Sequence, residues 1–302
     1  MTDKKMNTDP LGRFQIFKGV FTFIKNIRSF YRMNIFSILL LIVPIRAFLL
    51  EQANISVWLS AAAYCDKKDY SIMKLAGPAK GFLVKDIIHD TKTDLQGYIG
   101  VLPSSKTIYV VFRGSSSIRN WIEDAEFKKI TYNTFPSCEC SVHDGFYKSA
   151  MAIIDQVIPS VKSLLREYNY NIIVTGHSYG AAVAQLIAME LLARNIESNV
   201  YNFGQPRIGD VAYAAFVNER LKELWRIVHN HDIVPHIPPI KAFDYYHSCR
   251  EVFENENGDI KLCSANECED IDCSQQFKLK DTSAKDHDIY LGHIMDCSES
   301  IL

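Results

Sequence analysis

The segment Asn171–Ala182 constrains the fold more than any other part of the chain. It reads NIIVTGHSYGAA and contains the pattern Gly-x-Ser-x-Gly, with a short apolar run before it and a strong helix former after it. In that context the pattern is typical of a sharp strand-to-helix turn that holds a serine hydroxyl clear of a sheet. Gly176 and Gly180 are expected there because a side chain would collide with neighbouring backbone. Ser178 is therefore predicted to be a nucleophile at the N-terminus of a helix.

Strand and helix patterns alternate through the rest of the chain. Apolar, β-branched and aromatic runs predict strands at 106–112, 171–174, 198–203 and 223–228, and apolar spacing predicts helices at 151–168 and 181–194. Strands separated by helices indicate an α/β sheet with helices on its faces. No internal repeat or linker-like tract follows residue 50, so one domain is expected from there onward.

The charge balance argues against a nucleic-acid partner. The 302 residues include 33 Lys and Arg and 35 Asp and Glu, which gives a formal net charge of −2. No basic run stands out beyond the N-terminal leader. Hydrophobic residues make up 48% of the chain, which is enough to bury a core and excludes a disordered, collagen-like or coiled-coil protein.

Residues 33–45 form an uncharged, mostly apolar run near the N-terminus. The run is shorter than a membrane-spanning helix and matches the hydrophobic region of a signal peptide. Either translation begins at Met33, or the run is an uncleaved anchor. We therefore divide the chain into a basic leader (1–32), a signal-peptide hydrophobic region or signal anchor (33–50), and a catalytic domain (51–302).

The cysteines form an even set of eight, which is typical of disulfide bonds in an oxidising compartment. Cys263, Cys268 and Cys273 lie among acidic residues but lack the Cys-x2-Cys spacing with histidine of a zinc site, so disulfides are favoured over a metal. The sequon Asn54-Ile55-Ser56 also fits a secreted chain. The expected location is outside the cell or in the secretory-pathway lumen, with anchoring through residues 33–50 as the alternative.

A serine nucleophile needs a base, and the base needs an orienting carboxylate. In α/β-hydrolases the order along the chain is serine, then acid, then histidine. Asp232 follows the predicted strand at 223–228 and is favoured as the acid over Asp210, which also follows a strand. His287 and His293 are the candidate bases near the C-terminus, and their positions alone do not separate them.

Several segments, in the same order, resemble the fungal class 3 (Rhizomucor-type) triacylglycerol lipases. They are the serine turn and residues 110–122, 142–146, 202–207, 232–236 and 286–290. The resemblance implies an α/β-hydrolase-type fold with a mostly parallel central sheet, helices on both faces and a short helical lid. It also implies the triad Ser178, Asp232 and His287, with an oxyanion hole at Ser115 and Tyr179. Where Tyr179 stands, the family usually has leucine.

The lid has support in the residues themselves. Ile118, Trp121 and Ile122 lie at helical spacing i, i+3, i+4 and form one apolar stripe. A closed lid would bury this stripe over the acyl groove, and an open lid would present it to lipid. The resemblance further implies a long-range disulfide between Cys65 and Cys297.

These features predict a serine carboxylic-ester hydrolase, and above all a triacylglycerol or acylglycerol lipase that forms an acyl-enzyme. The expected partner is a lipid ester at a lipid–water interface, with transient membrane-surface contact through the lid. No metal or other cofactor is required. The alternatives are a phospholipase A1, a feruloyl-type esterase, and a catalytically inactive lipid-binding homologue.

Overall fold

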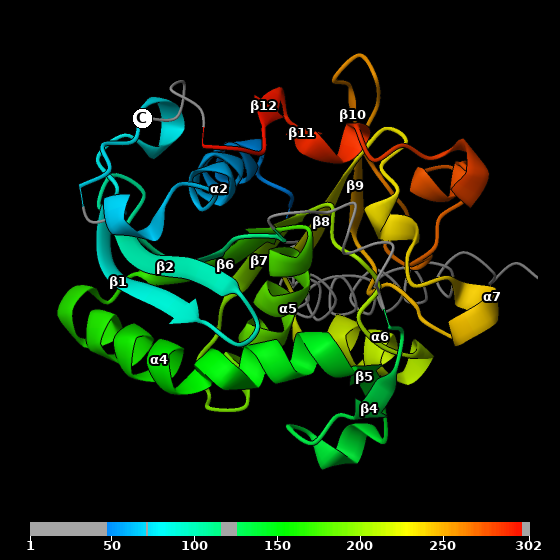
Figure 1. Cartoon of the computed structure of the whole chain (residues 1–302), viewed down its shortest axis with the longest axis horizontal. Helices are drawn as coiled ribbons and strands as arrows, with labels where there is room; N and C mark the ends of the chain where they lie inside the picture. The colour runs from blue at the N-terminus through cyan, green and yellow to red at the C-terminus, as the bar shows by residue number, and fades with distance from the viewer. Residues whose placement is uncertain (1–46, 71, 116–125, 298–302) are drawn as a thin grey trace, which may run out of the picture. The chain divides into compact units, whose positions relative to one another are not determined.

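An eight-stranded sheet forms the centre of the computed structural model, which describes residues 47–70, 72–115 and 126–297 (Figure 1). The strand order is β1-β2-β3-β6-β7-β8-β9-β10. The bounds are β1 Leu83–Asp90, β2 Leu95–Leu102, β3 Thr107–Phe112, β6 Asn171–His177, β7 Asn199–Phe203, β8 Leu224–His229, β9 Glu251–Glu254 and β10 Ile260–Leu262. Pairing is parallel from β3 through β9 and antiparallel at both edges, so the predicted mostly parallel sheet is confirmed.

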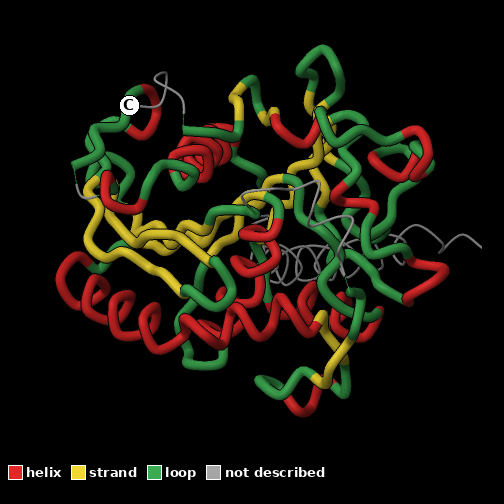
Figure 2. The backbone as a smooth tube through the Cα atoms, viewed as in Figure 1, coloured by secondary structure: helices red, strands yellow, loops and turns green. Residues whose placement is uncertain are grey.

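Helices cover both faces of this sheet, as Figure 2 shows in red against yellow. Helix α2 (Leu50–Ala62) packs on one face against β3, β6 and β7. Helix α4 (Asp144–Tyr168) and helix α5 (Tyr179–Leu192) pack on the other face; α5 covers β3, β6 and β7, and α4 contacts α5 and the edge strands β1 and β2. Besides short 3-10 helices, the remaining described elements are α6 Val211–Arg220, α7 Ile240–Phe243, and the two-stranded ladders β4 Lys129–Thr131 with β5 Ser141–His143 and β11 Ile289–Tyr290 with β12 His293–Ile294.

Strand β3 shows why the sheet needs cover on both faces. All six of its residues are buried. Ile108, Val110 and Phe112 join the core under α4 and α5, whereas Tyr109 and Val111 join the core under α2. Side chains alternate across a strand, so a continuous apolar run supplies both cores at once.

The predicted elements are present, and the largest difference lies at the start of α4. That helix begins at Asp144, seven residues before the predicted 151–168. The side chain of His143 explains the early start, because its Nδ1 accepts hydrogen bonds from the amides of Gly145 (3.1 Å) and Phe146 (3.3 Å). A side-chain acceptor in this position satisfies amides that the helix itself leaves unpaired.

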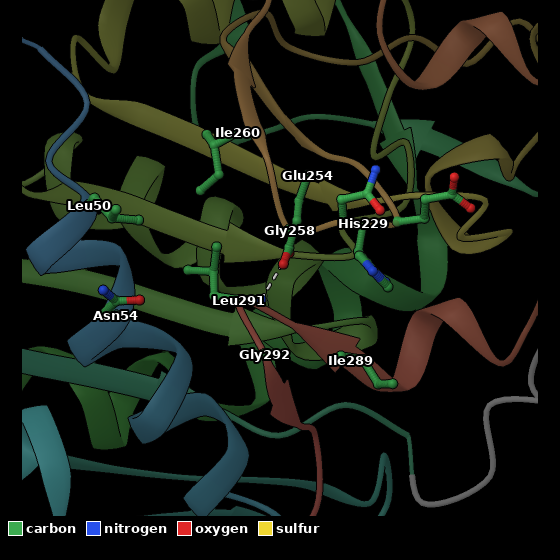
Figure 3. Close-up of a pocket in the computed structure, with 11 residues that line it drawn as sticks. Leu50, Asn54, His229, Glu254, Gly258, Ile260, Ile289, Leu291 and Gly292 are labelled. Carbon is green, nitrogen blue, oxygen red and sulfur yellow. Dashed lines mark hydrogen bonds between the residues drawn. The ribbon is translucent and has the colours of Figure 1, made fainter.

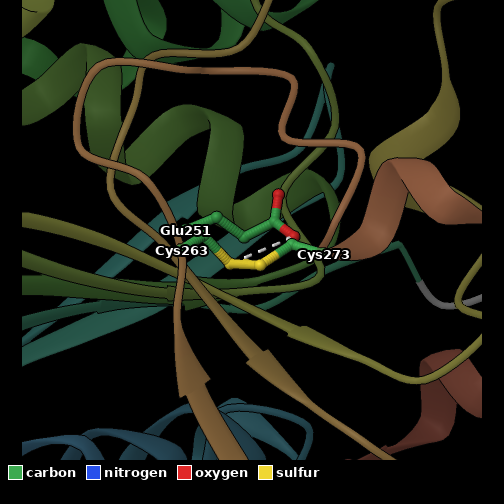
Figure 4. Close-up of side chains that lie close together, drawn as sticks. All are labelled: Glu251, Cys263 and Cys273. Atoms are coloured by element: carbon green, nitrogen blue, oxygen red, sulfur yellow. Dashed lines mark hydrogen bonds between the residues drawn. A yellow bond between two sulfur atoms is a disulfide. The ribbon is translucent and has the colours of Figure 1, made fainter.

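All eight cysteines are paired, as the sequence predicted. The bonds are Cys65–Cys297, Cys138–Cys140, Cys249–Cys268 and Cys263–Cys273. Glu251 lies beside the last of these bonds (Figure 4), and its Oε1 accepts the amide of Ser274 at 2.8 Å. Sulfurs bonded to each other offer no thiolate to a metal, so this cluster is a structural crosslink.

Two sequence predictions lie outside the described residues. They concern the leader, with most of the hydrophobic segment at 33–50, and the lid stripe of Ile118, Trp121 and Ile122. Residues from Phe48 onward belong to one compact unit. Among the described residues, no helix combines the length and apolar character needed to cross a bilayer.

The His143 cap predicts a pH-dependent stability. Burial lowers the pKa of His143 from about 6.5 to about 4, so between these values the unfolded chain binds the extra proton. The free energy of unfolding should therefore fall as the pH drops from 6.5 towards 4, by up to about 1.4 kcal/mol per pH unit from this group. In His143→Asn, which keeps a capping acceptor but does not titrate, urea unfolding should show a shallower decline. An equal decline in both proteins would contradict this role.

Candidate active site

Ser178 occupies the turn between β6 and α5. Strand β6 ends at His177, and helix α5 begins at Tyr179. Its backbone has φ 58° and ψ −127°, a conformation that L-residues rarely adopt and that costs about 1–3 kcal/mol. A Cβ at Gly176 would lie 2.6 Å from the Gly180 carbonyl, and one at Gly180 would lie 2.5 Å from the Arg113 carbonyl oxygen. The predicted steric need for both glycines is thus present in the structure.

Asp232 and His287 form a buried pair beside this turn. His287 Nδ1 lies 2.8 Å from Asp232 Oδ2, and the two side chains are 1% and 0% exposed. Asp232 Oδ1 accepts the amide of Val234 at 2.8 Å, and Tyr290 donates its phenol proton to Oδ2. Burial and the nearby Asp232 charge raise the pKa of Tyr290 well above its usual value, which keeps the phenol a donor. With three donors the carboxylate is held in one orientation.

The rival candidates are engaged elsewhere. Asp210 caps α6 by accepting the amide of Tyr213 at 2.9 Å, and its other oxygen accepts the amide of Ser141 at 2.8 Å. His293 Nε2 accepts the indole proton of Trp58 at 2.8 Å. Of the predicted acids and bases, the structure therefore brings together Asp232 and His287.

The predicted nucleophile and the predicted base each have one polar atom without a hydrogen-bond partner in the described part of the chain. Ser178 Oγ and His287 Nε2 are both buried, and neither has a hydrogen-bond partner among the described residues. The ring of His287 lies 4.3 Å from that of His177, the residue before Ser178. The two atoms without a partner are the ones that a serine–histidine proton transfer would join.

The region of the predicted oxyanion hole lies close to Ser178. Tyr179 is the first residue of α5, so its amide lies at the N-terminal end of that helix. Its phenol points to α4, where it contacts Ser149 Oγ at 2.5 Å and donates to the Gly145 carbonyl at 3.3 Å. Ser115 follows Gly114, at which a Cβ would lie 2.9 Å from Ser178 Cβ.

A buried ion pair that the sequence analysis missed supports the loop after Asp232. Arg207 binds Glu269 through two hydrogen bonds of 2.8 Å and donates to the carbonyls of His236 (2.6 Å) and Pro238 (3.1 Å). Glu269 is adjacent to the Cys249–Cys268 disulfide. The two partners lie 62 residues apart. The signal available in the sequence was a charged residue directly after a predicted strand, in Gly-Gln-Pro-Arg, where an unpaired arginine would be expensive to bury.

A cavity of about 490 Å³ is lined in part by Ile289, Leu291 and Gly292, which follow His287 in the chain (Figure 3). Its lining also includes His229 and Glu254, and Glu254 accepts the Leu291 amide at 2.8 Å. Ser178 is not part of the lining, so this cavity is separate from the predicted nucleophile.

Comparison with known proteins agrees with this geometry. The class 3 lipase family matches residues 109–242. A lipase of Rhizomucor miehei is 40% identical over 197 residues, which are 63% of this chain and 53% of that protein. The chain thus spans about half the length of the curated relatives that it matches.

Solved structures extend the agreement to most of the chain. The triacylglyceride lipase of Rhizomucor miehei is 31% identical, with a TM-score of 0.76, and the match covers 83% of this chain and 98% of the other. A triacylglycerol lipase whose catalytic centre is formed by a serine protease triad is 30% identical, with a TM-score of 0.75 and the same coverage. With both fold and sequence shared over nearly the whole of these structures, the chain belongs to the class 3 lipase family.

Proposed function

We propose that this protein is a serine hydrolase of carboxylic esters, with acylglycerols as its substrates. The observation that carries the proposal is the buried Asp232–His287 pair, with its 2.8 Å hydrogen bond, beside a serine held on a strained strand-to-helix turn. The family membership and the triad of the related triacylglycerol lipase support it.

In the proposed reaction, His287 Nε2 takes the proton of Ser178 Oγ as the oxygen attacks the ester carbonyl. The imidazolium then protonates the leaving alcohol. In the second half of the reaction, His287 takes a proton from water as the water oxygen attacks the acyl-enzyme carbonyl, and gives it to Ser178 Oγ as the carboxylic acid is released. Asp232 fixes the imidazole tautomer, because its carboxylate accepts from Nδ1 and leaves Nε2 free to act as the base. The amide of Tyr179 and the residue Ser115 would bind the oxyanion, and one such donor contributes about 3–4 kcal/mol.

The substrate class and location are parts of the same proposal. Relatives that act on triacylglycerols support a lipid ester as substrate, and the apolar stripe of Ile118, Trp121 and Ile122 supports contact with a lipid surface. Four disulfide bonds support a secreted or lumenal protein.

Replacing the nucleophile gives the direct test. Ser178→Ala should lose at least roughly a thousandfold in kcat on p-nitrophenyl butyrate, because the hydroxyl forms the acyl-enzyme. It should also fail to react with a fluorophosphonate probe. Ser160→Ala, on the outer helix α4, removes a hydroxyl that bonds only Asp86 and serves as the control. Retention of most activity in Ser178→Ala would refute the proposed reaction.

The substrate class is tested with tributyrin, a phosphatidylcholine and a feruloyl ester at equal concentrations. We expect the highest kcat/KM on tributyrin, with a rise in rate above its solubility limit because the apolar stripe binds the new interface. Preference for the phospholipid or the feruloyl ester would exclude the acylglycerol assignment while leaving ester hydrolysis intact.

Gly204 offers a test of the space around His287. It has φ +56°, and a Cβ there would lie 2.7 Å from both His287 Cε1 and Tyr290 Oη. Gly204→Ala should therefore displace the imidazole and lower kcat by roughly a hundredfold or more. Gly258→Ala is the matched control, since it has φ +80° and open space around its Cβ position, so it adds similar backbone strain without the clash. Equal kcat in the two variants would show that the contact does not control the imidazole.

A further inference from the structure

His177 lies between two groups that reach it from distant parts of the chain. Its Nδ1 is 2.6 Å from the phenol oxygen of Tyr64, and its Nε2 is 2.9 Å from the backbone carbonyl oxygen of His287. Tyr64 lies 113 residues before it, just past the end of α2, and His287 lies 110 residues after it. The ring therefore connects a helix on one face of the sheet with the segment that carries the proposed base.

The hydrogen-bond partners of His177 determine which of its ring nitrogens carries the proton. A carbonyl oxygen only accepts, so His177 Nε2 must carry the proton and donate to His287. His177 Nδ1 is then an acceptor, and Tyr64 must donate its phenol proton to it. Burial lowers the pKa of His177 well below its usual value and raises the pKa of Tyr64, so the neutral ring and the protonated phenol are both favoured. The hydrogen bonds thus run in one direction, from Tyr64 to His287.

On its other side, Tyr64 contacts the segment Gly114–Ser115, here termed the oxyanion strap. The backbone of Gly114 packs against the phenol oxygen of Tyr64, which donates to His177. The approach is close, since a Cβ at Gly114 would lie 2.3 Å from the Tyr64 oxygen. One hydroxyl group thus packs against the strap on one side and is hydrogen-bonded to His177 on the other.

The position of Tyr64 is itself restrained. The next residue, Cys65, forms a disulfide bond with Cys297. The amide of Tyr64 also donates to the Ala61 carbonyl at 3.0 Å, which continues the last turn of α2. The phenol of Tyr64 therefore extends from a restrained backbone, and it can fix the position of the segments that it contacts.

We propose that Tyr64 is a positioning residue that aligns the oxyanion strap with the segment bearing His287, through its contact with Gly114 and its hydrogen bond to His177. Its phenol is not hydrogen-bonded to Ser178 Oγ or to His287 Nε2, which have no partner among the described residues. It keeps the proposed base and the proposed oxyanion donor at a fixed distance from each other. This matters most when negative charge develops on the substrate oxygen, because a displaced group then lowers the rate most. The inference rests on the proposed ester hydrolysis and adds a residue to it.

The kinetic test compares Tyr64→Phe with Tyr98→Phe in the full chain. Each loses one phenol hydrogen bond of 2.6 Å to a group buried in the same region, but Tyr98 donates to the Leu59 carbonyl on α2 rather than to the site. We expect Tyr64→Phe to lower kcat on p-nitrophenyl butyrate roughly tenfold with KM within about twofold, less than the loss from deleting an oxyanion donor. Tyr98→Phe should keep the wild-type kcat while losing a similar amount in melting temperature.

A spectroscopic readout separates positioning from general destabilisation. In wild-type protein labelled with ¹⁵N-histidine, His177 should show the Nε2–H tautomer. In Tyr64→Phe it should shift towards Nδ1–H or a mixture, because Nδ1 has lost its donor. Equal kcat losses in the two variants, or an unchanged kcat and tautomer in Tyr64→Phe, would overturn the inference. Absence of ester hydrolysis in wild-type protein would instead refute the proposed function, and the tautomer measurement would still decide the hydrogen-bond assignment.

Discussion

The close crossing of β6 and α5 at Ser178 is the constraint on which the rest of the structure depends. The turn holds one residue in an unfavourable backbone conformation, so the elements on both sides must be rigid enough to maintain it. They are rigid because β6 lies at the centre of the sheet and α5 is enclosed between the sheet and α4. The neighbouring parallel strands then end at the same edge, which brings the loops after β7 and β8, with Gly204 and Asp232, next to the serine.

Local sequence signals were sufficient to predict the central strands and the serine turn, but not the elements and contacts that surround them. The serine turn, the runs that became β3, β6, β7 and β8, and the preference for Asp232 over Asp210 all follow from residues adjacent in sequence. Helix α2 was missed because it is apolar on several sides and lacks the one-sided pattern of a surface helix. His287 and His293 could not be separated by spacing, since only the fold shows that His293 accepts from Trp58.

The supports of the site are long-range and polar, which explains why periodicity does not reveal them. The pairs Arg207–Glu269 and Tyr64–His177 join residues 62 and 113 positions apart. Such groups are tolerated inside a protein because each donor has found an acceptor, and a partly satisfied network would be less stable than an apolar core. The same condition gives the site its rigidity, because a side chain with all its partners in place has few alternative orientations.

The ion pair between Arg207 and Glu269 limits how segments of this protein can be exchanged with those of a relative. The segment between Cys263 and Cys273 follows β10 and is rich in acidic residues; one disulfide joins its two ends, and another joins its Cys268 to Cys249. This segment supplies the carboxylate that neutralises Arg207, which in turn holds the backbone after Asp232. A chimera that took this segment from a relative would have to keep a carboxylate at the position of Glu269, because without it Arg207 would lie buried and unpaired.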